Sequence, residues 1–143
     1  MRKNIPILLV EDDQIDQQTV ARAFRKNKIT NSLFIVENGK EALAYLRHEG
    51  PYGDPQKAPR PGIILLDLHM PIMNGMELLT ILKQDEDLKS IPVVVLTTSQ
   101  KENDQVESFR LSVAGYVIKP LEFGDFVDAI KTIDLYWTLS ELC

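Results

Sequence analysis

The sequence predicts an α/β domain of the doubly wound type, in which a five-stranded parallel sheet carries helices on both faces. Short, continuous apolar segments alternate along the chain with segments whose apolar residues recur every three or four positions. Continuous apolar runs are typical of parallel strands covered on both faces, and the second spacing is typical of amphipathic helices. Strand and helix alternate five times, which gives right-handed crossovers that place helices on both sides of one sheet.

Four of the predicted strands are clear and the fifth is shorter. They cover residues 7–10, 33–36, 63–66, 93–96 and 116–118. The first apolar run is interrupted by Pro6 and ends at Glu11, so it is too short for a signal peptide. No apolar stretch reaches the roughly 20 residues that cross a membrane. We therefore expect a cytoplasmic protein with no membrane segment.

Three predicted helices carry an apolar stripe. In the first helix, the residues that share a face are Ile15, Thr19, Val20, Ala23 and Phe24. The stripe of the third helix is less regular and comprises Met76, Leu79, Leu82 and Lys83. The last helix has the clearest stripe, with Phe123, Phe126, Val127, Ile130, Ile133 and Trp137. The stripe of the last helix is expected to pack on the sheet.

The segment 50–62 interrupts this alternation with four prolines and three glycines. Such a composition predicts a long surface loop between the second helix and the third strand. Two interpretations stay open, a recognition surface and a tolerated insertion, because lengthening a loop costs little free energy. His48, just before this loop, is expected to be a solvated residue at the end of the second helix.

Composition narrows the class of protein. The chain has 143 residues, which suits one domain over 1–143, and its formal net charge is −5. The basic residues are scattered among acids, so nucleic-acid binding is not expected. The one cysteine, Cys143, excludes an internal disulfide and fits a reducing compartment.

Polar residues follow the predicted strands at the points where the strands end. Glu11, Asp12 and Asp13 follow the first strand, Asp67 follows the third, Thr97 the fourth and Lys119 the fifth. The carboxyl ends of parallel strands share one edge of the sheet, where ligands bind. Clustered carboxylates repel unless they hold a proton or a cation, and an all-oxygen set favours Mg²⁺. Alternatively, Asp12 or Asp13 caps the first helix.

Motifs in the same order resemble those of the response regulator receiver family of two-component signalling. They are Val10-Glu11-Asp12-Asp13, the run from Leu65 to Gly75 around Asp67, Val95-Leu96-Thr97-Thr98-Ser99, and Gly115-Tyr116-Val117-Ile118-Lys119-Pro120. The resemblance covers residues 5–133. It implies the flavodoxin-like receiver fold with strand order 2-1-3-4-5.

The resemblance also implies a role for each matching residue. Asp67 would be the phosphoacceptor, Thr97 the hydroxyl and Lys119 the lysine of the site. Mg²⁺ would be bound by Asp12, Asp67 and the backbone carbonyl of His69, with Glu11 acting through water. Tyr116 would be a switch aromatic, and the bond between Lys119 and Pro120 would be cis.

The implied function is that of a single-domain response regulator. A sensor histidine kinase would transfer a phosphoryl group to Asp67 in a Mg²⁺-dependent phosphorelay, and the output would run through protein contacts. The C-terminal extension 134–143 is too short for an effector domain. Its Tyr136 and Trp137 are expected to line a homodimer or partner surface, or else to pack on the chain's own sheet. Together with the 50–62 loop they are similar to the small regulators that partner phytochrome-type kinases.

Two other functions remain as alternatives. A receiver-like module could bind partners without being phosphorylated, although the complete set of acids argues against it. An aspartyl-phosphate phosphatase would also use an acidic strand end and Mg²⁺. Such enzymes usually carry a second aspartate two residues after the nucleophile, where this chain has His69. We therefore expect a phosphoacceptor with at most slow self-dephosphorylation rather than an enzyme.

Overall fold

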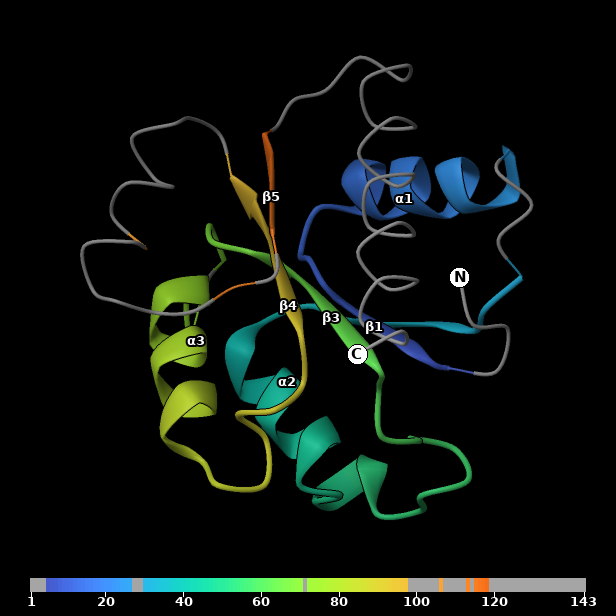
Figure 1. The fold of residues 1–143 in the computed structure, drawn as a ribbon. Coiled ribbons are helices and arrows are strands. Elements are labelled where there is room, and N and C mark those ends of the chain that lie inside the picture. Colours follow the sequence, from blue (N-terminus) through green and yellow to red (C-terminus); the bar gives the residue numbers. More distant parts are fainter. Residues whose placement is uncertain are drawn as a thin grey trace, which may run out of the picture.

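The fold is built on one parallel sheet in which consecutive strands are not always neighbours. The computed structural model describes residues 5–26, 30–70, 72–97, 106, 113 and 115–118, and for Thr97 and 115–118 it describes the backbone alone. The five strands are β1 (Ile7–Val10), β2 (Leu33–Val36), β3 (Ile63–Asp67), β4 (Val93–Thr97) and β5 (Gly115–Ile118). Their order is β2-β1-β3-β4-β5, which confirms the predicted topology (Figure 1).

The strand register aligns the ends of the strands at one edge. Val10 pairs with Val36 on one side and with Leu66 on the other, and all four strand pairs are parallel. Asp67 is the last residue of β3 and pairs with Leu96, so Thr97 follows one position later at the same edge. The residues that follow β1 and end β3 and β4 therefore converge, as the sequence predicts.

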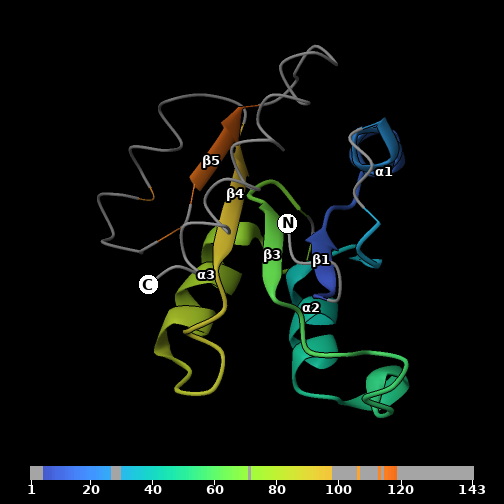
Figure 2. The same cartoon turned by 45° about the vertical axis from the view of Figure 1, so that its right-hand side comes forward.

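Helices lie on both faces of the sheet. The described helices are α1 (Gln14–Lys26), α2 (Gly39–Leu46) and α3 (Gly75–Gln84), with a short 3-10 helix, η1, at Gly50–Tyr52. α1 lies on one side of the sheet, and α2 and α3 lie on the other (Figures 1 and 2).

Alternate strand residues supply the two cores. On the α1 side, the buried strand residues are Ile7, Leu9, Ile63, Leu65, Val94 and Leu96. On the side of α2 and α3, they are Leu8, Val10, Val36, Ile64, Leu66, Val93 and Val95. Because β1 and β3 are buried on both faces, they need continuous apolar sequence, which is why they are easy to find in the chain. β2, at the end of the sheet, is only partly buried, and its Ile35 is 39% exposed.

Two of the predicted helix faces need correction. Ile15 does not share the buried face of α1 and is 73% exposed; it is the second residue of α1, and only three residues separate that helix from the end of β1. In α3, Leu78 is buried together with Leu79 and Leu82, whereas Met76 and Lys83 are only half-buried. Burial lowers the pKa of Lys83 by desolvating its ammonium group.

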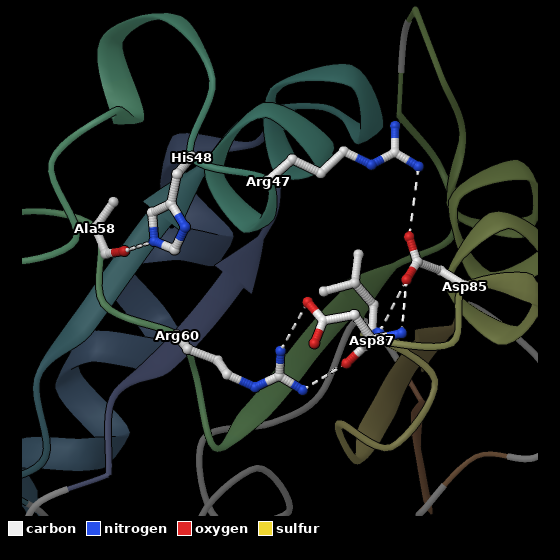
Figure 3. Close-up of polar contacts among 7 residues, drawn as sticks. Arg47, His48, Ala58, Arg60, Asp85 and Asp87 are labelled. Atoms are coloured by element: carbon white, nitrogen blue, oxygen red, sulfur yellow. Dashed lines mark hydrogen bonds and ion pairs between the residues drawn. The ribbon is translucent and has the colours of Figure 1, made fainter.

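The loop from Gly50 to Gly62 is fixed to the fold by hydrogen bonds. The Tyr45 hydroxyl donates to the carbonyl oxygen of Pro59 at 2.9 Å, and Nε2 of His48 lies 2.8 Å from the carbonyl oxygen of Ala58 (Figure 3). Ala58 is buried, and the Tyr52 hydroxyl donates to the Glu41 carboxylate. His48 is therefore half-buried and bonded rather than solvated, and it adopts a φ of 55°.

Ion pairs join this region to the segment between α3 and β4. Arg60 donates from Nη2 to the carbonyl oxygen of Asp87 at 2.7 Å, and its Nη1 lies 3.4 Å from the Asp87 carboxylate (Figure 3). Arg47 lies 3.7 Å from the Asp85 carboxylate. Arg60 precedes β3 and Asp87 precedes β4. Their contacts therefore lie at the edge where the strands begin, opposite the edge with the carboxyl ends of β1 and β3.

Several predicted features lie outside the residues that the structure describes. They include the stripe from Phe123 to Trp137, Tyr136, and the bond between Lys119 and Pro120. Among the described residues, no helix is both long and apolar enough to pass through a bilayer.

Candidate functional site

Three carboxylates converge at the edge of the sheet where β1 and β3 end. Glu11, Asp12 and Asp67 each offer one oxygen, and these oxygens all lie within 4.8 Å of one another. Glu11 is 0% exposed and Asp67 is 2% exposed, whereas Asp12 is exposed. The three acids that the sequence assigns to one site are therefore brought together.

The loop between β1 and α1 sets the position of the first two acids. The backbone N–H of Glu11 donates to the carbonyl oxygen of Val36 at 2.9 Å, which extends the pairing of β1 and β2 by one residue. The carbonyl oxygen of Glu11 accepts a 2.7 Å hydrogen bond from Nε2 of Gln17, in α1. Glu11 is thus held through its backbone on both sides.

Asp13 caps the first helix. Its Oδ1 accepts from the backbone N–H of Ile15 at 2.8 Å and from that of Asp16 at 3.3 Å. Such a bond satisfies helix N–H groups that have no partner within the helix. The two sequence-based interpretations of these acids therefore both apply, with Asp13 as the cap and Asp12 in the acidic cluster.

The loop between β3 and α3 folds back on Asp67. Oδ1 of Asp67 accepts from the backbone N–H of His69 at 3.1 Å. The N–H of Gly75 donates to the carbonyl oxygen of Leu68 at 3.1 Å, and a Cβ at position 75 would collide with the backbone of Asp67 and Leu68. Glycine is required there because two backbone segments meet. The His69 side chain is exposed, and binding of metal by its carbonyl stays a prediction.

A second glycine supports the same loop from the side of α2. The N–H of Gly39 donates to the carbonyl oxygen of Met73 at 3.0 Å. A Cβ at position 39 would lie 2.7 Å from that oxygen and 2.8 Å from Cγ of Met73. The start of α2 and the loop that follows Asp67 are therefore in direct backbone contact.

The acidic cluster suits a small, hard cation. Two unit charges about 4 Å apart repel by about 4 kcal/mol at an effective dielectric constant near 20. Here two of the three acids are buried, and every ligand atom in the cluster is an oxygen. Oxygen sets of this kind select Mg²⁺, Mn²⁺ or Ca²⁺ over metals that prefer nitrogen or sulfur. The three carboxylates can thus hold a divalent metal ion.

The remaining predicted residues are only partly placed. Thr97 ends β4 and Tyr116 lies in β5, where it pairs with Val95, but the side chains of both lie outside the structural description. Lys119, Tyr136 and Trp137 lie outside the described residues altogether. Their proposed roles stay predictions.

Two contacts at the site could not be found from the sequence. Gln17 is one of several polar residues in α1, and no pattern in the chain marks it as a partner of Glu11. Gly39 carries a weak signal, because glycine directly after Asn38 suits the start of a helix. Its contact with Met73 joins segments more than thirty residues apart and depends on the tertiary fold.

Comparison with known proteins gives consistent matches over most of the chain. The model of the response regulator receiver domain matches residues 7–131. The chain is 40% identical to Response regulator Rcp1 of Synechocystis over 131 residues, which are 92% of this chain and 87% of that protein.

Solved structures agree with the sequence comparison. The phosphorylated cyanobacterial phytochrome response regulator RcpA superimposes with a TM-score of 0.81 at 38% identity, covering 94% of each chain. The Mn²⁺-bound form of Rcp1 superimposes with a TM-score of 0.78 at 40% identity, covering 93% of this chain and 94% of that one.

Proposed function

We propose that Asp67 accepts a phosphoryl group from a histidine kinase, and the premise is that this chain belongs to the response regulator receiver domain family. Receiver domains of response regulators are signalling proteins that interact with histidine kinases. The observation that carries the proposal is the acidic cluster, in which Asp67 is buried against Glu11 and lies within reach of Asp12.

We propose Mg²⁺ as the metal, held by Asp12, Asp67 and the carbonyl of His69, with Glu11 acting through water. The oxygen-only donor set supports this choice, and a relative binds Mn²⁺, an ion of similar coordination preference. When bound, the ion would neutralise charge that builds up on the transferring phosphoryl oxygens.

The chain's own residues orient the nucleophile. An oxygen of the Asp67 carboxylate would form a bond to phosphorus while the bond between phosphorus and the kinase's histidine nitrogen breaks, so the imidazole leaves and an acyl phosphate remains. The bond from the His69 N–H to Oδ1 at 3.1 Å restricts rotation of the carboxylate. Gly75 packs against the backbone of Asp67 and so restricts the position of the Cα from which the Asp67 side chain extends.

We propose that Thr97 and Lys119 bind the phosphoryl group and that Tyr116 transmits the change. The strand register supports this assignment, because Thr97 follows the partner of Asp67 and pairs with Ile118, the residue before Lys119. Movement of the Thr97 hydroxyl toward the phosphoryl group would leave space for Tyr116 to turn inward. Such a change can shift a conformational equilibrium only by its differential contact energy.

We propose that the partner kinase is of the phytochrome type and that the protein acts in the cytoplasm through contacts with other proteins. The match to RcpA, described as a phytochrome response regulator, supports this type of partner. Tyr136 and Trp137 are proposed to line a homodimer or partner surface. Beyond slow loss of its own phosphoryl group, we propose no enzymatic activity, since His69 stands where a phosphatase would carry a second aspartate.

The proposal is tested by incubating the protein with Mg²⁺ and acetyl phosphate and measuring its intact mass. We expect wild type to gain one phosphoryl group and Asp67→Asn to gain none. Asp13→Asn is the matched control, because it removes an acid from the neighbouring loop while asparagine still caps α1. Turnover of diverse phosphate esters would instead support a phosphatase, and no mass gain by wild type would support a module that works without phosphorylation.

A further inference from the structure

We propose that Gln17 is a positioning residue for the metal site, acting through the peptide that joins Glu11 to Asp12. This inference deepens the proposed function and rests on it. Gln17 lies in the first turns of α1 and is half-buried, and its Nε2 donates to the carbonyl oxygen of Glu11 at 2.7 Å. That oxygen belongs to the peptide unit between the two acids.

The geometry of the peptide unit explains how a bond to one oxygen can orient two carboxylates. A peptide is planar, so a hydrogen bond that orients its oxygen orients the whole plane, including the two Cα atoms from which the Glu11 and Asp12 side chains start. The preceding peptide is fixed at the Glu11 N–H by the carbonyl oxygen of Val36 at 2.9 Å. Both peptides around Glu11 are therefore anchored, one by β2 and the other by Gln17.

The two acids depend on this anchor to different degrees. Glu11 is fully buried, so packing also restricts its side chain. Asp12 is exposed, so packing restricts its side chain less, and the position of its carboxylate depends more on its backbone. A rotation of the shared peptide would move the Asp12 carboxylate away from the other two oxygens, which now lie within 4.8 Å. Metal affinity should therefore be sensitive to Gln17 although its side chain is not among the clustered ligands.

The chain offers a matched control on the same helix. Gln18 is the next residue, has the same side chain and is exposed. A substitution at either position changes helix propensity equally, since glutamine and methionine have similar propensities. Any difference between the two variants therefore reports the contact with Glu11 and not the helix.

The experiment compares Gln17→Met with Gln18→Met in the full chain. Methionine has nearly the shape of glutamine but no N–H to donate. The dissociation constant for Mn²⁺ is measured from the free ion's paramagnetic resonance signal, and stability without metal is measured by urea unfolding. We expect the dissociation constant to rise about tenfold in Gln17→Met, as is typical for loss of a group that orients metal ligands, and to stay unchanged in Gln18→Met.

Gln17→Glu is a second variant that separates positioning from charge. An ionised carboxylate keeps the length of the side chain but cannot donate a hydrogen bond. Its added negative charge alone would tighten metal binding, whereas loss of the anchor predicts weaker binding. Weaker binding by this variant therefore supports the inference even if Gln17→Met fails to fold.

The outcomes are distinguishable from failure of the proposed function. Wild type that binds no Mn²⁺ would overturn both the metal site and this inference. Wild type that binds Mn²⁺, with both Gln17 variants within about twofold of it, would overturn the role of Gln17 alone, since a positioning contact should cost more. Lower stability in urea with unchanged affinity would show that the bond is only structural and would also overturn the inference.

Discussion

Glu11 and Asp67 are buried next to each other, at 0% and 2% exposure, and each offers an oxygen within 4.8 Å of the other. Two negatively charged carboxylates at this distance repel each other, and burial strengthens the repulsion by lowering the local dielectric constant. We therefore expect this repulsion to lower the stability of the metal-free fold and a bound divalent cation to offset it. This coupling gives the site a thermodynamic signature that can be measured without a kinase.

Replacing one of the two buried acids should therefore stabilise the metal-free protein. We expect Glu11→Gln to raise the free energy of unfolding without metal by about 1 kcal/mol, because it removes a charge from the pair and keeps an oxygen as acceptor. We also expect Mg²⁺ to stabilise this variant less than wild type. Urea unfolding with and without Mg²⁺ measures both effects. Glu49→Gln, at an exposed site, is the control, and equal stabilisation of Glu11→Gln and wild type by Mg²⁺ would contradict the coupling.

The contact of Gly39 with Met73 predicts a large effect from one added methyl group. In Gly39→Ala the new Cβ would lie 2.7 Å from the Met73 carbonyl oxygen, so one of the two backbone segments must move. We expect a loss of about 2 kcal/mol in the free energy of unfolding, and slower phosphorylation by acetyl phosphate because the loop after Asp67 is displaced.

Gly53→Ala is the control for this substitution. Gly53 has a helical φ of −66°, and a Cβ there would be 3.5 Å from its nearest neighbour, the Gly50 carbonyl oxygen. We expect alanine to be tolerated or slightly stabilising at this position, because it restricts the unfolded chain. Equal effects of the two substitutions would show that the contact with Met73 is unimportant.

The strands and the acidic cluster could be predicted from sequence for one physical reason. Burial on both faces requires continuous apolar runs, so β1 and β3 are visible in the chain, and the strand ends place Glu11 and Asp67 together. The strand order follows from the family resemblance and not from the spacing of apolar residues. These features depend on local sequence or on the order of motifs.

The features that the sequence does not predict depend instead on contacts between distant segments. Ile15 fits the apolar stripe of α1, but helical spacing alone cannot show which turns of a helix pack on the sheet, and Ile15 is exposed. The sequence places His48 in solvent, because the conformation of the loop that supplies its partner, the carbonyl oxygen of Ala58, cannot be predicted from the sequence. Gln17 and Gly39 act through backbone atoms of distant segments, and backbone atoms carry no sequence signal.

Tyr45 in α2 and Tyr52 in the loop from Gly50 to Gly62 predict loss of stability at alkaline pH. Burial raises the pKa of Tyr45 from 10.0 to about 12, and burial followed by the hydrogen bond to Glu41 raises that of Tyr52 to about 12. Above about pH 10 the unfolded chain releases protons that the folded protein keeps, so stability should fall as pH rises from about 10 to about 12.

Tyr45→Phe separates the contribution of one tyrosine. Near neutral pH we expect it to cost about 1 kcal/mol, because the carbonyl oxygen of Pro59 loses its 2.9 Å hydrogen bond. Between about pH 10 and about pH 12 we expect stability to fall less steeply in this variant than in wild type. Urea unfolding across this range measures the slope. Identical slopes would mean that Tyr45 ionises as easily in the folded protein as in the unfolded chain.

The ion pair between Arg60 and Asp87 should matter little for stability and not at all for the metal site. Both side chains are largely exposed, at 45% and 82%, so solvent screens the attraction. We expect Arg60→Ala to lower the free energy of unfolding by at most about 1 kcal/mol, and less in high salt. Its Mn²⁺ affinity should equal that of wild type, because the pair lies at the opposite edge of the sheet. Lys57→Ala, an exposed substitution in the same loop, is the control, and weaker metal binding by Arg60→Ala alone would contradict this separation.

Ile72 predicts that a polar substitution near the site can stabilise the protein. This residue has a φ of 62° and is 71% exposed, so it pays the steric cost of a left-handed backbone conformation and gains little from burial. A branched side chain is strongly disfavoured there, whereas asparagine tolerates it. We expect Ile72→Asn to raise the free energy of unfolding by about 1 kcal/mol.

Ile15→Asn is the matched control, because Ile15 is 73% exposed but helical, and there we expect a change of no more than about 0.5 kcal/mol. If both substitutions destabilise the protein equally in urea, the left-handed conformation of Ile72 carries no strain, and the loop after Asp67 is relaxed.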